Sequence, residues 1–277
     1  LISMFAFPNG IPAITERIDF PYYVFGNTNN VIKYALPGLC FSFIHDSIKY
    51  GKIKIHTWLL LGLIFLTLLM SWSVTAIIGL LIFTIIQFNK IGEKQIFITY
   101  IATLLGSMIV TIFLLFFKNN SNLFAWILGL LGKDSTLTNR EPLWMNALES
   151  IKNSPVWGYG IQNEEIINYY IGNYFGAHNY FLDTLFRGGF ISLIVLLIIL
   201  FFLSKKLFRS NGNLMTRALI GTCSAYFIMW SAEPFMNTEY IMFSIIFLLS
   251  FKINILEEYY YNKPKLNHEI GNLINVS

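Results

Sequence analysis

The residues of this chain best suited to chemistry are Arg140 and His178, which lie in one polar stretch between apolar blocks. An imidazole titrates near neutral pH and can take a proton from a reacting hydroxyl as a general base. A guanidinium can bind phosphate oxygens through paired hydrogen bonds and stabilise charge on a leaving group. Each residue also has a plainer interpretation, because a lone histidine is commonly structural and this arginine could contact lipid headgroups.

Aromatic residues and two glycines lie between these candidates. The segment Pro155–Gly160 reads Pro-Val-Trp-Gly-Tyr-Gly, which predicts a tight turn that carries Trp157 and Tyr159. Three tyrosines follow between Asn168 and Phe175. These rings could stack on the apolar faces of sugars, or they could form the aromatic belt that membrane proteins place at the interface. Both interpretations stay open at this point.

Two helices are predicted to carry the candidates. A cap residue, an early acid and a proline in the first turn predict that one helix begins at Thr138–Pro142. Apolar residues then recur at helical spacing on one face: Trp144, Ala147, Leu148 and Ile151. Such a helix suits the bilayer surface and would place Arg140 near the headgroups. The second helix opens at Ala177–Asn179 and runs to Arg187–Gly189, where the chain is expected to re-enter the membrane.

The composition predicts the class of protein that must position these residues. The 277 residues are 55% hydrophobic and only 12% charged, which is too few charges for a soluble globular enzyme. The apolar residues come in unbroken blocks, so we expect an all-α, multispanning membrane protein and no β-barrel. The net charge of +4 is thinly spread and predicts no nucleic-acid partner. Cys40 and Cys223 both fall in apolar blocks, so neither a disulfide nor a metal framework is expected.

The apolar blocks predict about seven transmembrane helices. The spans lie near 31–48, 58–71, 74–88 and 96–117 in an N-terminal membrane segment, 1–117, and near 189–204, 214–230 and 238–251 in a C-terminal one, 189–251. The apolar run Trp58–Phe88 is too long for one ordinary crossing, and we divide it at Ser71–Ser73. Residues 252–277 form a tail.

Basic residues between the spans predict the orientation. When the spans alternate, twelve of them share one face: Lys49, Lys52, Lys54, Lys90, Lys94, Lys205, Lys206, Arg209, Arg217, Lys252, Lys263 and Lys265. This face and the tail are cytoplasmic by the positive-inside rule. Residues 118–188 then form one large extracytoplasmic loop, and long loops of this kind are usually functional. We expect the catalytic surface on this loop.

The order of motifs on this loop resembles the O-antigen ligase and Wzy-type polysaccharide polymerase superfamily. The motifs are Arg140-x3-Trp144, Pro155-x2-Gly158-Tyr159-Gly160, His178-Asn179-x2-Leu182 and Gly189-Phe190-Ile191. Weaker likeness extends to Gly26-Asn27-x-Asn29 and to Ser71–Ala76, which lies between two predicted spans. No single motif is specific for this superfamily. The order, spacing and placement of the motifs are specific when they are taken together.

The resemblance implies glycosyl transfer on the outer face of the bacterial cytoplasmic membrane. The partners would be a polyprenyl-diphosphate-linked oligosaccharide donor, a glycan acceptor, membrane lipid, a flippase and a chain-length regulator. His178 and Arg140 would be catalytic. The residues expected to bind substrate are Trp144, Trp157, Tyr159, Gly160, Asn179, Arg187 and Arg17. No cofactor is expected, and the scattered carboxylates of the loop predict metal-independent chemistry.

Two departures from the family pattern affect this expectation. Many ligase-like members have an arginine where this chain has Val74, so one positive contact to the diphosphate would be missing here or supplied elsewhere, by Arg17 or Arg187. The family also has more spans upstream, which, with the Leu start, predicts that the chain is incomplete.

Three functions remain open in the sequence. Val74 and the composition, which suggests an AT-rich genome and a capsule-producing bacterium, favour a polymerase that joins repeat units. A ligase would transfer the glycan to a final acceptor instead. A transporter or flippase of lipid-linked sugars is the alternative from another class, and such proteins place ionisable residues within the membrane. Here the charges counted as approaching the spans are Asp46, Arg217 and Glu239, all near span ends, which argues against transport.

Overall fold

Helices make up most of this chain in its computed structural model, which describes residues 2–12, 21–24, 26–27, 29–88, 93–116, 140–208, 213–233 and 237–258. The elements are α1 (Ile2–Ala6), β1 (Tyr22–Tyr23), β2 (Gly26–Asn27), α3 (Val31–Tyr50), α4 (Ile55–Ser71), α5 (Val74–Phe88), α6 (Glu93–Phe116), α8 (Arg140–Asn153), α9 (Glu164–Ile171), α10 (Tyr180–Phe208), α11 (Leu214–Trp230) and α12 (Asn237–Phe251). β1 and β2 pair as a short antiparallel ribbon. The fold is all-α, as the sequence predicts.

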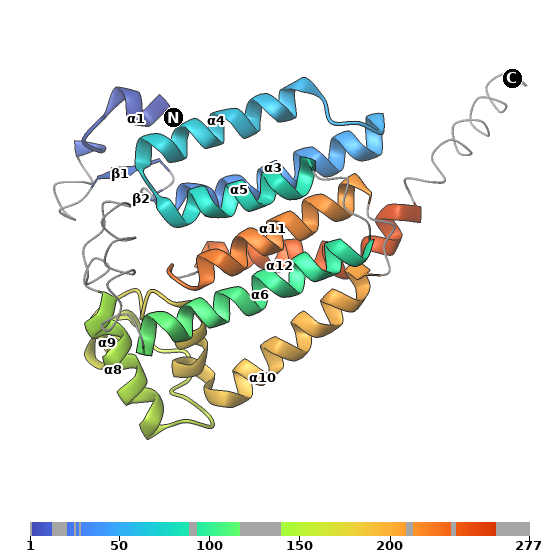
Figure 1. The fold of residues 1–277 in the computed structure, drawn as a ribbon. Helices are drawn as coiled ribbons and strands as arrows, with labels where there is room; N and C mark the ends of the chain where they lie inside the picture. The colour runs from blue at the N-terminus through green and yellow to red at the C-terminus, as the bar shows by residue number, and fades with distance from the viewer. Residues whose placement is uncertain are drawn as a thin grey trace, which may run out of the picture.

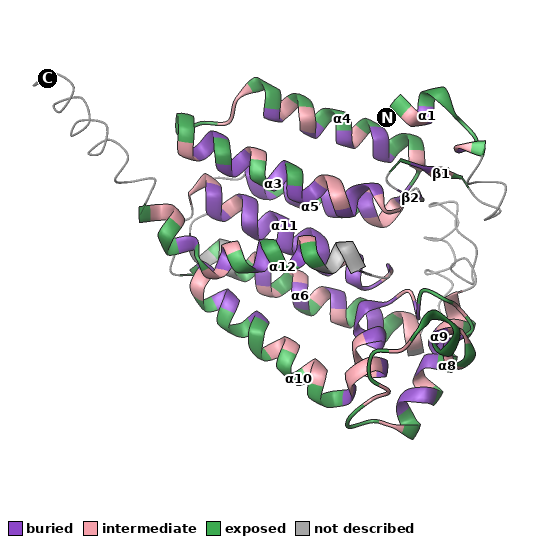
Figure 2. Cartoon of the chain, turned by 180° about the vertical axis from the view of Figure 1, so that it is seen from behind, coloured by how far each residue is buried: buried purple, intermediate pink, exposed green. Residues whose placement is uncertain are grey.

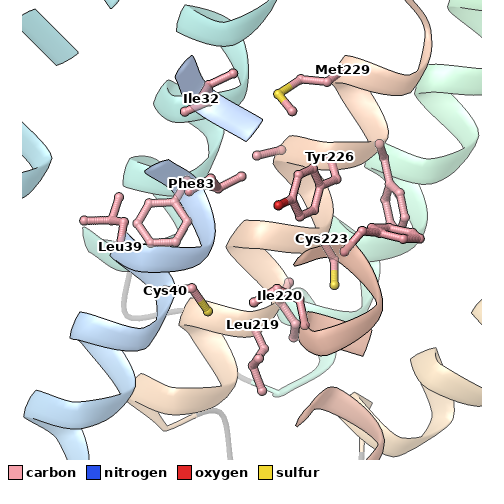
Figure 3. Packing of buried hydrophobic residues seen from close by; sticks show 14 of the residues in the cluster. Ile32, Leu39, Cys40, Phe83, Leu219, Ile220, Cys223, Tyr226 and Met229 are labelled. Carbon is pink, nitrogen blue, oxygen red and sulfur yellow. The ribbon is translucent and has the colours of Figure 1, made fainter. Parts of the chain in front are cut away.

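Helix α11 is the centre of the bundle. Fourteen of its 17 residues are buried, and α3, α5, α6 and α12 pack around it (Figure 2). Figure 3 shows Leu39 and Cys40 of α3 and Phe83 of α5 against the side chains of α11. Small residues allow close helix contact, because a Cβ built on Gly79 of α5 would lie 3.4 Å from the carbonyl oxygen of Ala225. A helix that is apolar on every side belongs in the core of a bundle.

Within the described residues, helices occupy the ranges predicted as spans, and the predicted span 96–117 is described as far as residue 116. The break in the long apolar run lies where the sequence placed it, since α4 ends at Ser71 and α5 begins at Val74. Trp72 closes α4 in the left-handed region at φ 47°. Among the described residues, Ile98–Leu115 of α6 and Tyr180–Phe208 of α10 are long and apolar enough to cross a membrane.

The outer helices expose apolar side chains. On α4, α6 and α10 these include Leu59, Leu66, Ile98, Ile109, Ile194 and Phe202. Figure 2 shows the exposed positions along the outer sides of α4 and α10, whereas α11 is buried. Apolar patches of this extent are expected where a surface faces lipid or a protein partner.

The two ends of the bundle differ in charge. Lys49 lies in the last turn of α3, Lys54 precedes α4, and Lys205 and Lys206 lie in the last turn of α10. These helix ends lie together at one end of the bundle, and α8, α9, the β1–β2 ribbon and the C-terminal end of α11 lie at the other (Figure 1). The candidates Arg140 and His178 belong to the end that carries α8 and α9.

Candidate functional site

Arg140 is the first residue of α8 and contacts the end of α11. Its Nη1 donates a hydrogen bond to the carbonyl oxygen of Ala232, and its Nη2 lies 3.3 Å from Oε1 of Glu233. The two charged side chains are 18% and 7% exposed. The guanidinium is therefore held by two acceptors from one short segment.

His178 lies between α9 and α10 with φ at 52°, in the left-handed region that residues other than glycine rarely adopt. Its Nδ1 is buried and has no hydrogen-bond partner among the described residues. The pKa of His178 is lowered to about 4, chiefly by burial and also by the nearby cations Arg140 and Lys33, whereas the Glu233 carboxylate acts in the opposite direction. The imidazole is therefore neutral at pH 7 and can accept a proton.

Asn179 connects His178 to the same short segment at the end of α11. Its Nδ2 donates to the carbonyl oxygen of Ser231 at 2.9 Å, and its Oδ1 accepts from the backbone nitrogens of Phe181 and Leu182, both at 3.1 Å. The side chain is 1% exposed. Asn179 therefore caps α10 and positions its neighbour His178, and almost none of its surface is available to a substrate.

Residues 231–233 bring the two candidates together. Ser231 accepts from Asn179, next to His178, while Ala232 and Glu233 hold Arg140. Arg140 and Glu233 form an ion pair, and the charges of both act on the pKa of His178. Arg140 and His178 are far from residues 231–233 in the sequence, and this short segment after α11 contacts Arg140 and the neighbour of His178.

The Pro-x-x-Gly-x-Gly turn docks on the backbone of α10 at a kink. Tyr159 and Gly160 donate their N–H groups to the carbonyls of Phe186 and Arg187 at 2.8 and 2.7 Å. In return, Phe190 donates to the carbonyl of Pro155 at 2.8 Å. Gly189 has φ 60° and ψ −162°, which marks the kink. The two family motifs thus form one structural unit in which the glycines allow backbone contact.

The aromatic residues of this unit divide into core and surface. Trp144 is 2% exposed and packs with Ile167, Ile171 and Phe186 in a second apolar cluster. The apolar stripe of α8 therefore faces α9 and α10, and the prediction that it faces the bilayer is wrong. The sequence showed an apolar face but could not show that other helices cover it.

Tyr159 and Trp157 have opposite environments within the turn. The ring of Tyr159 stacks on Phe186 with centroids 5.0 Å apart, and its hydroxyl donates to the carbonyl of Ser150 at 3.1 Å. Trp157 is 74% exposed. Of these two rings, Trp157 is the one with surface to offer a sugar, and Tyr159 holds the turn in place.

Arg187 and Arg17 are the two further arginines predicted to contact the donor. Arg187 lies in α10, where its carbonyl accepts from Gly160, and its Nε is buried without a hydrogen-bond partner among the described residues. Arg17 lies outside the residues that the structure describes. Val74 is the first residue of α5.

The two weaker upstream motifs meet in space. Ser73, which follows α4, donates through Oγ to Oδ1 of Asn29 at 2.8 Å, although 44 positions separate them. Asn29 comes just before α3, and the contact therefore ties the start of α3 to the break between α4 and α5. Both elements lie at the end of the bundle that carries α8 and α9 (Figure 1).

Two charged residues of the site were missed by the sequence analysis. Lys33, in the first turn of α3, and Glu233, just after α11, are both buried. The statement that only Asp46, Arg217 and Glu239 approach the spans was therefore incomplete. The signal was available, because Lys33 interrupts an apolar block and Glu233 directly follows one. Both additional charges also lie at span ends, as Asp46, Arg217 and Glu239 do. The argument against transport, which is that no charge lies in the middle of a predicted span, therefore still holds.

These features define a helical membrane protein with a buried cluster of charged and titratable groups at one end of its bundle. A family model described as O-antigen ligase matches residues 57–197, about half of the chain, and the chain belongs to this family. The matched residues contain Arg140, the glycine turn and His178.

One relative with a curated name is the exopolysaccharide production protein ExoQ of Rhizobium meliloti (strain 1021). It is 32% identical over 130 residues, which cover 41% of this chain and 30% of that protein. The chain thus spans less than a third of the relative that it matches. No solved structure matches the chain.

Proposed function

We propose that this chain is an extracytoplasmic polysaccharide polymerase, which joins polyprenyl-diphosphate-linked oligosaccharide repeat units by glycosyl transfer. The observation that carries the proposal is the joining of Arg140 and His178 through residues 231–233. The family and the name of the relative support polysaccharide chemistry. An O-antigen-type ligase, which differs in its acceptor, is the second candidate supported by the same family.

The proposed reaction uses His178 as the base and Arg140 as the group that binds the leaving diphosphate. The acceptor hydroxyl oxygen bonds to the anomeric carbon of the donor while the bond from that carbon to the diphosphate oxygen breaks. The hydroxyl proton goes to the imidazole, and the electron pair leaves with the diphosphate, whose charge the guanidinium stabilises. No metal ion or cofactor has a role in this proposal.

The charges around His178 suit a base that is activated when the donor binds. Arg140 and Lys33 lower the pKa of His178, so that the imidazole holds a proton poorly before the reaction. A bound diphosphate offsets both cations, and a nearby anion raises the pKa of an imidazole. Donor binding would therefore bring His178 closer to the neutral pKa at which proton transfer is most effective.

The membrane arrangement is part of the proposal. The lysines at the ends of α3 and α10 and before α4 lie at one end of the bundle, and positive charge favours the cytoplasmic side. This distribution supports the proposal that α8, α9, Arg140 and His178 face the extracytoplasmic side of the cytoplasmic membrane, where lipid-linked repeat units would be presented. A flippase that delivers them and a regulator of chain length are the partners that such a reaction would need.

The test follows the fate of the lipid-linked repeat unit. The full-length protein is purified and supplied with polyprenyl-diphosphate-linked repeat units. These are extracted from a strain in which the gene for this protein is deleted. A polymerase produces carrier-linked chains of two or more repeats and releases polyprenyl diphosphate. Transfer only to a different anchor would identify a ligase, and movement of the donor across vesicles without a new glycosidic bond would overturn the proposal in favour of a flippase.

A further inference from the structure

Glu233 makes an ion pair that the family match does not include, because the matched residues end at 197. Its Oε1 lies 3.3 Å from Nη2 of Arg140, while Nη1 of the same guanidinium donates to the neighbouring carbonyl of Ala232. A guanidinium carries five N–H groups in a rigid plane. Two contacts on different nitrogens fix that plane and leave the other N–H groups for a further acceptor.

The burial of this ion pair is unusual for a contact that serves only to hold two helices. The Glu233 side chain is 7% exposed and the Arg140 side chain 18%. A buried carboxylate is costly unless it is paired and hydrogen-bonded, and well-packed apolar residues are often as stabilising as a buried ion pair. The Ala232 carbonyl could hold α8 without a charge. The Glu233 carboxylate additionally fixes the orientation of the Arg140 guanidinium, and its negative charge acts on His178.

We propose that Glu233 is a positioning residue of the site, which fixes the Arg140 guanidinium so that its unused N–H groups meet the donor diphosphate beside His178. This inference rests on the proposed glycosyl transfer. Glu233 does not contact the reacting atoms in the proposal and acts through Arg140. Its carboxylate also limits the net positive charge around His178, which carries Arg140 and Lys33 as neighbours.

The experiment compares specific activity, measured per amount of inserted protein, in Glu233→Gln, Glu233→Asp and the matched control Glu149→Gln. Glu149 is an exposed carboxylate on α8, so its variant reports the loss of one charge nearby. We expect Glu233→Gln to lose about tenfold to hundredfold in transfer from extracted polyprenyl-diphosphate repeat units, as for other charged hydrogen bonds. Glu233→Asp should fall between it and the unchanged control, because it keeps the charge but shortens the reach.

A double-variant cycle separates positioning from a structural tether. If Glu233 acts through Arg140, then Glu233→Gln added to Arg140→Lys should cost less than threefold more, because the guanidinium it positions is gone. If Glu233 only held α8 in place, Glu233→Gln would lower the amount of inserted protein and its melting temperature but would leave the activity per molecule unchanged. Full activity per molecule in Glu233→Gln, or additive losses in the double variant, would overturn the inference.

Failure of this inference can be told apart from failure of the proposed function. If Glu233→Gln is fully active while Arg140→Ala and His178→Ala are inactive, Glu233 has no positioning role and the proposed reaction stands. If all three variants transfer repeat units normally, the proposed reaction itself is wrong. Poor insertion of Glu233→Gln does not remove the test, since Glu233→Asp and the normalised activity still report the effect.

Discussion

Gly189 of α10 lies against the carbonyl oxygen of Val156 in the glycine turn. A Cβ built on Gly189 would be 2.2 Å from that oxygen. The contact is reciprocal, because a Cβ on Gly158 would be 2.6 Å from the carbonyl carbon of Arg187. Neither position has room for a side chain, and both have a positive φ. The two motifs are therefore fitted to each other at the level of the backbone.

Gly189→Ala should lower the stability of the folded protein strongly. The φ of 60° with ψ −162° is accessible essentially to glycine alone, and the added methyl collides with backbone that cannot rotate away. We expect a loss of about 2–5 kcal/mol from strain and overpacking together. Thermal unfolding of the detergent-solubilised protein measures it. Gly62→Ala on α4 is the control, since nothing lies within 4 Å of its Cβ, and equal melting temperatures for the two variants would contradict the account.

The helices could be predicted from the sequence because their lengths are limited by apolar blocks. Trp58–Phe88 exceeds one crossing, and this length, with the alternation of the basic loops, predicted the break that the structure has at Trp72. Arg140 and His178 could be chosen by residue type and by the order of motifs. These signals are local, and each needs only a few neighbouring residues.

The partners of the site could not be predicted, because they lie far away in the chain. Glu233 is 93 positions from Arg140, and Lys33 enters from the first turn of α3. The periodicity of α8 predicted that the helix has an apolar face, but it could not predict which element packs against that face. Trp144 was therefore assigned to the bilayer surface, whereas the structure buries it in an apolar cluster. The bond of Asn179 to Ser231 could not be predicted for the same reason, since it depends on tertiary structure.

Arg140→Lys should be nearly as damaging as Arg140→Ala. The guanidinium binds Ala232 and Glu233 through two nitrogens at once and keeps further N–H groups for a phosphate oxygen. An ammonium has no such fork. We expect at least about a tenfold loss in transfer per molecule for both variants, measured with extracted repeat units. The exposed Lys152→Ala on the same helix is the control. Normal polymer from the Lys variant alone would show that only charge is required.

The pH dependence of transfer should report an unusually acidic base. A base must be deprotonated, so activity falls as the pH drops through its pKa, which is about 4 for His178 in the free protein. The acid limb of kcat/KM, which reports the free enzyme, should therefore lie near that value. The acid limb of kcat should lie at higher pH, because bound diphosphate favours the imidazolium. A limb in kcat/KM at the ordinary pKa of histidine would mean that His178 is not the base.

Impermeant cysteine labelling should place the two ends of the bundle on opposite sides of the membrane. Cys40 and Cys223 are both fully buried, so they should not compete for the reagent. In intact cells, Tyr169→Cys on α9 should be labelled, because Tyr169 is 82% exposed. Lys52→Cys, in the connection after α3, should react only after the cells are permeabilised. The reverse pattern would place Arg140 and His178 on the cytoplasmic side.

The strongest test of His178 uses its backbone conformation. Its φ of 52° is unfavourable for most residues but natural for glycine, so His178→Gly should fold well while it lacks the imidazole. We expect it to lose about 10² to 10⁴ in rate, the usual contribution of a general base. Added imidazole should restore part of the activity by entering the vacated volume and taking the proton of the acceptor hydroxyl.

A second variant distinguishes this chemistry from a structural role in starting α10. His178→Asn also tolerates a positive φ and keeps a hydrogen-bonding side chain, but its amide cannot take a proton at neutral pH. If His178 is the base, the Asn variant should be as inactive as the Gly variant. Added imidazole should not rescue it, because the Asn side chain occupies volume that imidazole would need to enter. Polymer of normal length from the Asn variant would show that a hydrogen bond is enough, and Arg140 with the glycine turn would then be binding elements without a base at this position.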